Sequence, residues 1–343
     1  MNTIAAFILS AVVAFAVTAL LGIVVIPWLH KLKFGQTILD IGPNWHKQKQ
    51  GTPTMGGIMF MAGTVIAVII TVVTDKLMGG DILAGEYLLP LEIRSKLISG
   101  LLMAFAFGIV GFADDYIKVV KKRNLGLSIM QKTVAQVFII AAYLVSLYMS
   151  MGKQPYMYIP FIGNVEMGIF FWILGAAVIY ATINAVNFTD GIDGLCSSVT
   201  LTAAVAFVVI SVICKLSGVG VVASALAGGC AGFLVWNRNP AKVFMGDTGS
   251  MFLGGLVVAL AYAINCPLIL LCVGIIYVIE GLSDVIQIGY FKLTHGKRIF
   301  KMAPIHHHFE MSGWSEKKIV TVFSAVNIIG STAGILIMYF AAK

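Results

Sequence analysis

Ten apolar runs, each long enough to cross a lipid bilayer, constrain this chain more than any other feature of its sequence. They cover residues 3–29, 54–74, 96–113, 129–150, 168–186, 197–214, 220–236, 250–265, 268–289 and 318–341. A helix needs about 20 apolar residues to span the hydrocarbon core. Since 59% of the 343 residues are hydrophobic and only 11% are charged, a soluble domain of this length is excluded. The sequence therefore predicts an all-α, polytopic integral membrane protein with about ten transmembrane helices.

The basic residues predict how these spans are oriented. Loops rich in Lys and Arg stay in the cytoplasm, and with ten spans one side of the membrane holds 17 of the 23 basic residues. That side is expected to be cytoplasmic, which leaves both termini outside. The first run lacks a basic n-region and is too long for a signal-peptide core, so we expect it to be retained as a span. No linker interrupts the chain, and residues 1–343 are interpreted as a single transmembrane domain.

Three acidic clusters lie at the predicted cytoplasmic ends of spans. They supply Asp114 and Asp115 in GFADDYIK, Asn187, Asp190 and Asp193 in NFTDGIDGL, and Asp247 in MGDTGS. A carboxylate near hydrocarbon costs a few kcal/mol on insertion scales, so these acids are expected to be functional. Clustered carboxylates indicate a divalent metal and phosphate chemistry. The local alternatives are an acidic turn, an Asx-rich turn and a helix cap, respectively.

Helix geometry refines these expectations. Neighbouring residues of a helix point about 100° apart, so Asp114 and Asp115 are not expected to bind one metal together. One would hold Mg²⁺ while the other orients or deprotonates a substrate, and Asp114 would pair with Lys118 one turn later. Residues 187, 190 and 193 share one broad face if their segment is helical, but Gly191 and Gly194 permit a tight turn instead.

Two further cytoplasmic loops carry groups suited to phosphate or a nucleotide. The segment HKQKQGTPTMGG (46–57) combines lysines, including Lys49, with glycines that expose backbone amides, as a phosphate cradle does. Alternatively, Thr54 caps the following helix and the lysines only retain the loop in the cytoplasm. In WNRNPAKVFMGDTGS, Phe244 could stack on a base or simply mark the membrane interface.

The last cytoplasmic loop contains three consecutive histidines, His306, His307 and His308. Three successive side chains cannot all face one point, which argues against a zinc site. Near pH 7 an imidazole can hydrogen-bond a phosphate or a leaving group. In the preceding span, Glu280, Asp284 and Gln287 repeat at helical spacing and are expected to line a cytoplasm-facing groove. A kink near Gly281 or Gly289 would open that groove sideways to lipid.

The motifs HKQKQGTPTMGG, GFADDYIK, NAVNFTDGIDGL, NRNPAKVFMGDTGS and APIHHHFE occur in this order between residues 46 and 310. In these motifs the chain resembles the polyprenyl-phosphate N-acetylhexosamine-1-phosphate transferases. The three histidines after Ala-Pro-Ile point to the muramoyl-pentapeptide branch over the N-acetylglucosamine branch. The resemblance implies transfer of phospho-MurNAc-pentapeptide from UDP-MurNAc-pentapeptide to undecaprenyl phosphate, which yields lipid I and UMP for peptidoglycan. It also implies a Mg²⁺ requirement, a bacterial plasma membrane location with a cytoplasm-facing active site, contact with membrane lipid, and a homodimer.

The same resemblance implies roles for individual residues. Catalytic roles fall on Asp114, Asp115, Asp247, His306, His307 and His308, with Asp247 as the metal ligand. Substrate binding falls on Lys49, Thr54, Lys118, Lys132, Asn187, Asp190, Asp193, Asn237, Phe244 and Gln287.

Two other functions compete with this interpretation. A transporter or proton-coupled channel also places acids in spans, but it would more often carry them near the midplane and show paired halves. A sister transferase would use UDP-N-acetylglucosamine instead. Nucleic-acid binding is not expected despite the net charge of +8, because the basic residues are spread over five loops and form no stripe.

Overall fold

The computed structural model describes residues 1–32, 49–83, 90–120, 125–151 and 155–343. Its elements are α1 (Thr3–Lys31), α2 (Gly57–Leu77), α3 (Pro90–Val120), α4 (Ile129–Ser150), β1 (Tyr156–Ile159), β2 (Gly163–Glu166), α5 (Phe170–Thr189), α6 (Leu195–Ile213), α7 (Ser217–Asn237), α8 (Gly246–Ala263), η2 (Pro267–Ile269), α9 (Leu270–Val273), α10 (Ile275–Leu293), α11 (Ile305–Glu310) and α12 (Glu316–Ala341). The all-α fold is confirmed, because one two-stranded hairpin is the only sheet within these ranges.

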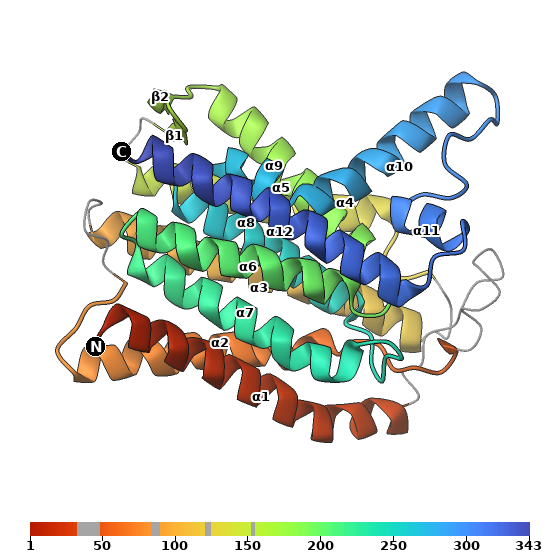
Figure 1. The fold of residues 1–343 in the computed structure, drawn as a ribbon, viewed down its shortest axis with the longest axis horizontal. Helices are drawn as coiled ribbons and strands as arrows, with labels where there is room; N and C mark the ends of the chain where they lie inside the picture. Colours follow the sequence, from red (N-terminus) through yellow and green to blue (C-terminus); the bar gives the residue numbers. More distant parts are fainter. Residues whose placement is uncertain (33–48, 84–89, 121–124, 152–154) are drawn as a thin grey trace.

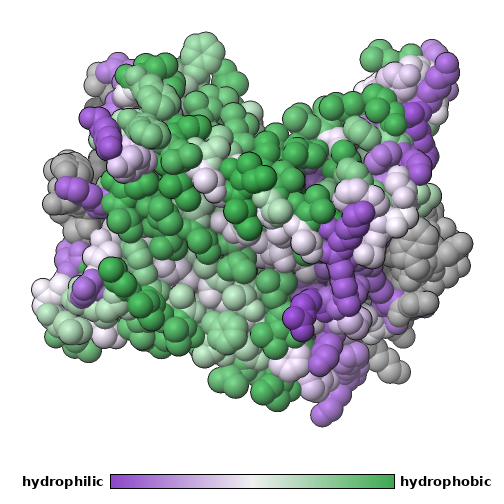
Figure 2. Space-filling view, in the orientation of Figure 1, coloured by the Kyte–Doolittle hydropathy of each residue, from purple (hydrophilic) through white to green (hydrophobic). Residues whose placement is uncertain are grey.

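The long helices lie side by side as a bundle (Figure 1). Within the described ranges nine helices are long and apolar enough to cross a membrane, and the number rises to ten if one bent pair of helices is counted as a single span. Both termini lie at the same end of the bundle (Figure 1), as an even number of crossings requires. Figure 2 shows hydrophobic residues over the middle of the visible face and hydrophilic residues gathered toward its right edge, where α11 and the far end of α10 lie.

The ninth predicted span, 268–289, is not one straight helix. The segments Pro267–Val273 and Ile275–Leu293 meet at Gly274 with a bend of 89°. The expected kink near Gly281 or Gly289 was therefore misplaced, since α10 continues through both residues. As a result, α10 projects away from the bundle (Figure 1).

Asn327 of α12 explains where the span breaks. A break inside the membrane leaves backbone groups without partners, and these must be satisfied by protein. The buried amide of Asn327 donates to the carbonyl of Val273 over 3.0 Å and accepts from the N–H of Ile276 over 3.4 Å. It also donates to the hydroxyl of Thr202 over 2.8 Å. One side chain thus holds both sides of the bend against α6.

Helix α8 lies at the centre of the bundle. In its most apolar window 89% of the residues are buried, against 22% for α1, so α8 is shielded from lipid by its neighbours. Small residues allow the backbones of α3 and α8 to approach closely. At Gly255 of α8, an added Cβ atom would lie only 2.8 Å from the Cα atom of Ala104 on α3.

The end of the bundle that carries the termini is closed by the hairpin. Strands β1 and β2 pair antiparallel, with Tyr156 opposite Glu166. Beneath them the fully buried ammonium of Lys96 contacts Glu92 over 2.6 Å and the side chain of Asn265 over 2.5 Å. The hydroxyl of Tyr156 donates to Glu92 over 3.1 Å. A buried charge needs such partners, so this network anchors the hairpin far from the acidic motifs.

Candidate active site

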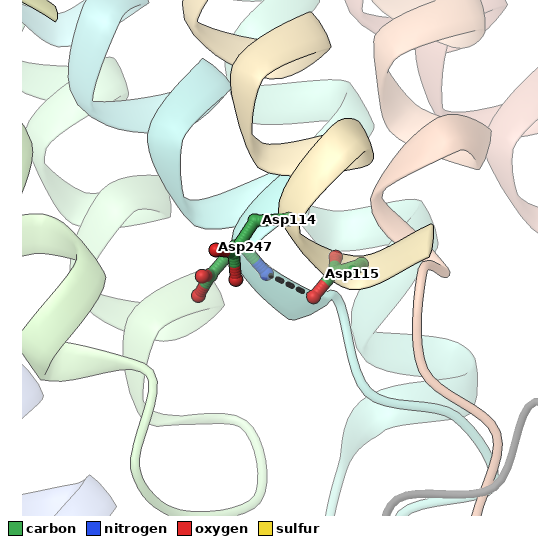
Figure 3. A group of neighbouring side chains, drawn as sticks. All are labelled: Asp114, Asp115 and Asp247. Atoms are coloured by element: carbon green, nitrogen blue, oxygen red, sulfur yellow. Dashed lines mark hydrogen bonds between the residues drawn. The ribbon is translucent and has the colours of Figure 1, made fainter. Parts of the chain in front are cut away.

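Three carboxylates converge where α3 ends and α8 begins (Figure 3). Asp114 and Asp115 are buried and come from the last turns of α3, while Asp247 comes from the first turn of α8 and is partly exposed. One oxygen of each lies within 4.8 Å of the others. The 100° separation predicted that the two neighbours would not serve one ion. Asp247 approaches from a second helix and lies within reach of both, and it stays a prediction that the two neighbours do not share one ion.

Gly111 makes this convergence possible. A Cβ atom on this residue of α3 would lie 2.1 Å from the carbonyl oxygen of Asp247 and 2.7 Å from the backbone nitrogen of Thr248. No real side chain tolerates such distances to backbone atoms. The glycine one turn before the aspartates therefore sets the spacing between the two helices that build the site.

Asp115 caps helix α8 from outside that helix. Its carboxylate accepts from the backbone N–H groups of Asp247 over 3.2 Å and Thr248 over 2.9 Å, and from the Thr248 hydroxyl over 2.7 Å. The sequence suggested that Asp247 could cap its own helix. Instead the cap residue is Met245, which makes no side-chain capping bond. A carboxylate at a helix N-terminus also complements the helix dipole, so Asp115 joins α3 to α8.

Two lysines neutralise much of the acidic charge. The ammonium of Lys118 lies 2.5 Å from Asp114 and 3.1 Å from Asp247, which confirms the expected pair one helical turn apart. Lys132 of α4 lies 2.9 Å from the same oxygen of Asp247. Asp247 is therefore held by cations from two helices, α3 and α4.

The α5–α6 segment is a turn, so the helical alternative for residues 187, 190 and 193 was wrong. Helix α5 ends at Thr189, and Gly194 adopts a left-handed φ of +79°. Asn187 reaches the acidic group, which is Asp114, Asp115 and Asp247. It donates to Asp247 over 2.9 Å and to Ser250 over 2.8 Å. Asp190 follows α5 directly. Removal from water, and then the charges of Asp247, Asp115 and Asp193, raise the pKa of the Asp190 carboxyl well above its usual range.

Asp193 points into a second polar cluster. It accepts from the ammonium of Lys49 over 2.6 Å, from the side chain of Asn239 over 3.1 Å and from the N–H of Ala241 over 2.9 Å. Glu316, the first residue of α12, also contacts Lys49, over 2.6 Å. Asn239 lies in the motif NRNPAKVFMGDTGS but was not predicted as a site residue, and Glu316 lies outside all five motifs.

The loop before α8 is closely packed on the first motif. Phe244 is half-buried; its N–H donates to the carbonyl of Pro53 and its carbonyl accepts from Gly56. Thr54 does not cap α2, whose cap residue is Gly56. Its hydroxyl instead lies beside Gly246, since a Cβ atom there would be 2.7 Å from it.

Asn237 is buried at the end of α7, and its amide is used inside the protein. It donates to the carbonyl of Val243 and accepts from the N–H of Gly194. These bonds tie the loop before α8 to the α5–α6 turn, so Asn237 supports the site from within. The part of the first motif before Lys49, residues 46–48, lies outside the described residues.

The three histidines face different partners, as expected. The buried ring of His306 contacts Glu280 of α10 through Nδ1 over 3.0 Å. Its Nε2 has no hydrogen-bond partner in the described structure and lies against the α5–α6 turn, because a Cβ atom on Gly191 would be 2.1 Å from it. His307 contacts Glu310 over 2.7 Å, and Nδ1 of His308 accepts from the N–H of Lys301.

Two of the three α10 residues that were expected to line a groove, Glu280 and Gln287, hold the following loop instead. Glu280 fixes His306, and Gln287 accepts from the N–H groups of Ile299 and Phe300, each over 3.1 Å. Gln287 also donates to the carbonyl of Phe300. Helix α10 thereby positions His306 next to the α5–α6 turn.

Comparison with known proteins finds a matching family and named relatives of this chain. A family model described as glycosyl transferase family 4 matches residues 97–265, the stretch that supplies all three converging carboxylates. The chain is 42% identical over 339 residues to a phospho-N-acetylmuramoyl-pentapeptide-transferase of Desulforudis audaxviator, covering 96% of this chain and 97% of that protein. It is 45% identical over 316 residues to a protein of the same name from Carboxydothermus hydrogenoformans, covering 90% and 91%. A Listeria monocytogenes protein of that name is 43% identical over 330 residues, covering 96% and 97%.

Proposed function

The chain belongs to the phospho-N-acetylmuramoyl-pentapeptide-transferase family, and on that basis we propose that it acts in bacterial peptidoglycan synthesis. The reaction moves phospho-MurNAc-pentapeptide from UDP-MurNAc-pentapeptide to undecaprenyl phosphate and yields lipid I and UMP. The observation that carries this proposal is the group of Asp114, Asp115 and Asp247 with two lysines at one end of the bundle. Carboxylates and ammonium groups at a membrane boundary suit an exchange between two phosphates, one of them on a lipid.

The acidic group fits Mg²⁺, which we propose as the cofactor. Mg²⁺ prefers hard oxygen ligands and binds proteins through one or two carboxylates. Asp115 is tied to two backbone N–H groups of α8 that cannot move aside. Asp247 accepts only from side chains, those of Lys118, Lys132 and Asn187, which can rearrange. Asp247, together with Asp114, is therefore best able to hold the ion. When bound, Mg²⁺ would neutralise charge on the diphosphate of the donor.

The remaining catalysis is positioning by the protein. The acceptor is a phosphate monoester that is mainly dianionic at pH 7, because its second pKa is about 6. One of its oxygens attacks the sugar-linked phosphorus in line, and the bond from that phosphorus to the bridging oxygen breaks. UMP leaves with the bridging oxygen and its electron pair. Lys118 and Lys132 neutralise the charge of Asp247 and face the phosphates. Asp114 orients the acceptor.

A two-step route through an aspartyl phosphate is the alternative. It would add a second attack of an anion on an anionic phosphorus, whereas the direct route needs only one, so the direct attack is favoured. Incubation of the enzyme with donor alone distinguishes the two routes. A phosphosugar adduct on the protein would support two steps, and its absence together with normal turnover on adding acceptor would support one.

We place the apolar tail of the acceptor along α4 and α5. A groove of about 480 Å³ runs between them, lined by Thr133, Val137, Ile140, Ala141, Leu144, Trp172, Ala176, Ala177 and Tyr180. Its first residue, Thr133, follows Lys132, which contacts Asp247. A polyprenyl chain in this groove would therefore begin next to the acidic group. Bulky substitution of Ala177 should raise the KM for the lipid acceptor without changing the KM for the nucleotide.

We further propose that the acidic end of the bundle faces the cytoplasm, that both termini face outward, and that the protein forms a homodimer. The excess of Lys and Arg at this end supports the orientation. A cysteine introduced at Lys317, labelled in right-side-out and inverted vesicles, tests the orientation. The dimer is an expectation of the family resemblance, and crosslinking in native membranes tests it.

Release of UMP by the purified protein tests the function itself. The protein would receive undecaprenyl phosphate, Mg²⁺ and either UDP-MurNAc-pentapeptide or UDP-N-acetylglucosamine, with Asp247→Asn as the control. Release from the muramoyl donor alone, lost in the control, would support the proposal. Release from the other donor would favour the sister transferase, and release from neither would favour the transporter.

A further inference from the structure

A second polar cluster lies at the same end of the bundle as the acidic group. Lys49, Asp193, Asn239 and Glu316 come from four segments that are far apart in the sequence. Glu316 contacts the ammonium of Lys49 over 2.6 Å, and it accepts from the N–H of Asp193 over 3.2 Å and the side chain of Asn239 over 3.1 Å. The α5–α6 turn connects this cluster to the acidic group, since Asn187 in the last turn of α5 contacts Asp247 and Asp193 in the turn contacts Lys49.

We propose that Glu316 is a positioning residue for the nucleotide donor and acts through Lys49. In this role it holds the ammonium of Lys49 and the α5–α6 turn in the arrangement that receives the uridine diphosphate group. The inference rests on the proposed function, because it takes a nucleoside diphosphate sugar as the donor.

Lys49 needs partners that fix its side chain before the donor binds. A lysine side chain is long and loses much rotamer freedom when it is fixed. Lys49 is held by two carboxylates at 2.6 Å each, and both are nearly buried, with 2% of the Asp193 side chain and 11% of the Glu316 side chain exposed. An ammonium has three N–H donors. Two bonds to carboxylates therefore fix its position and leave the third donor for the nucleotide. Preorganisation of this kind strengthens ligand binding.

Glu316 is suited to this task because its backbone is rigid. It is the first residue of α12, and the preceding Ser315 caps that helix by accepting from the N–H of Lys318. The backbone that carries this carboxylate is therefore fixed relative to the bundle. Lys49, by contrast, lies in the short turn before α2. The contact therefore lets the rigid helix α12 restrict the position of Lys49 in the loop.

Steady-state kinetics with Glu316→Gln would test the proposal. The amide keeps the shape and can still accept from Asn239, but it cannot hold the ammonium of Lys49 by charge. Loss of one charge-assisted bond should raise the KM for the UDP donor about tenfold. The kcat should stay within about twofold and the KM for undecaprenyl phosphate should not change. Glu316→Asp should recover part of the loss, and Glu166→Gln, an exposed glutamate of the hairpin, should behave as wild type.

A double-mutant cycle with Lys49→Gln separates positioning from a merely structural role. If Glu316 acts through Lys49, then Glu316→Gln should add little to the donor KM once Lys49 has been replaced. An equal fold-change in both backgrounds would overturn the proposal. So would an unchanged donor KM, or a Glu316→Gln protein whose melting temperature falls while both KM values rise together.

Direct binding of UMP, measured by calorimetry, keeps this inference distinct from the proposed function. Weaker binding to Glu316→Gln than to wild type and to Glu166→Gln is expected, whatever sugar the donor carries. If wild type binds UMP and Glu316→Gln binds it equally well, only the inference fails. If wild type binds no UMP, both the inference and the proposed function fail.

Discussion

Replacement of Gly111 by alanine should damage catalysis more than stability. The new Cβ atom would lie 2.1 Å from the carbonyl oxygen of Asp247, and ordinary contact begins at 3.4 Å, so α3 and α8 must separate by about 1.3 Å. The bond from the N–H of Thr248 to Asp115, now 2.9 Å, would then exceed hydrogen-bonding distance. Misplacement of catalytic groups by about 1 Å can cost about a hundredfold in rate, whereas overpacking costs about 1–3 kcal/mol of stability.

The assay is kcat for UMP release together with the melting temperature in detergent. Gly108→Ala is the matched control on the same helix one turn earlier. There the nearest atom to an added Cβ is the terminal methyl of Met61, at 2.6 Å, and a flexible side-chain end can move away. We expect kcat to fall about a hundredfold in Gly111→Ala and less than threefold in Gly108→Ala. A folded Gly111→Ala enzyme with near-normal kcat would refute the argument that this glycine sets the active-site spacing.

Three further outcomes follow from the site. Asp115→Asn should lower the melting temperature as well as the activity, because its carboxylate accepts three bonds from the first turn of α8; an inactive variant with an unchanged melting temperature would contradict the capping role. Chelation of divalent ions should abolish UMP release and added Mg²⁺ should restore it, with Asp247→Asn needing more Mg²⁺; full activity in chelator would exclude the metal proposal. Asp190→Asn should stabilise the metal-free protein more at pH 8 than at pH 5. The raised pKa of Asp190 makes folding bind a proton, so its penalty grows as pH rises above the usual carboxyl value; a gain that does not grow with pH would contradict this sign.

The membrane fold was largely predictable because apolar length and charge decide it locally. The break at Gly274 was not, because its stability depends on Asn327, about fifty residues later in the chain. A lone asparagine inside the last apolar run was the available signal, since buried amides seek partners. The sequence pattern could not indicate which backbone groups it would meet.

The candidate site divides in the same way. The residue types and the pairing of Asp114 with Lys118 follow from local spacing. The cap that Asp115 places on α8 joins positions more than 130 residues apart in the sequence, so no local rule reaches it. Glu316 was overlooked for a different reason. After Ser315, an acidic first residue is typical of any helix N-terminus, and this common local role conceals its contacts with Lys49 and Asp193.

The shielded position of α8 has a consequence for the bilayer around the protein. With 18 residues, this helix is about 27 Å long, shorter than a hydrocarbon core of about 30 Å. A lipid-facing helix of this length would tilt or thin the membrane to relieve the mismatch. Helix α8 meets neighbouring helices on almost all sides, so changes in acyl-chain length act first on α1 and the other outer helices. Asp247 therefore sits on an element whose depth is set by protein packing, and turnover should vary little between membranes of different thickness.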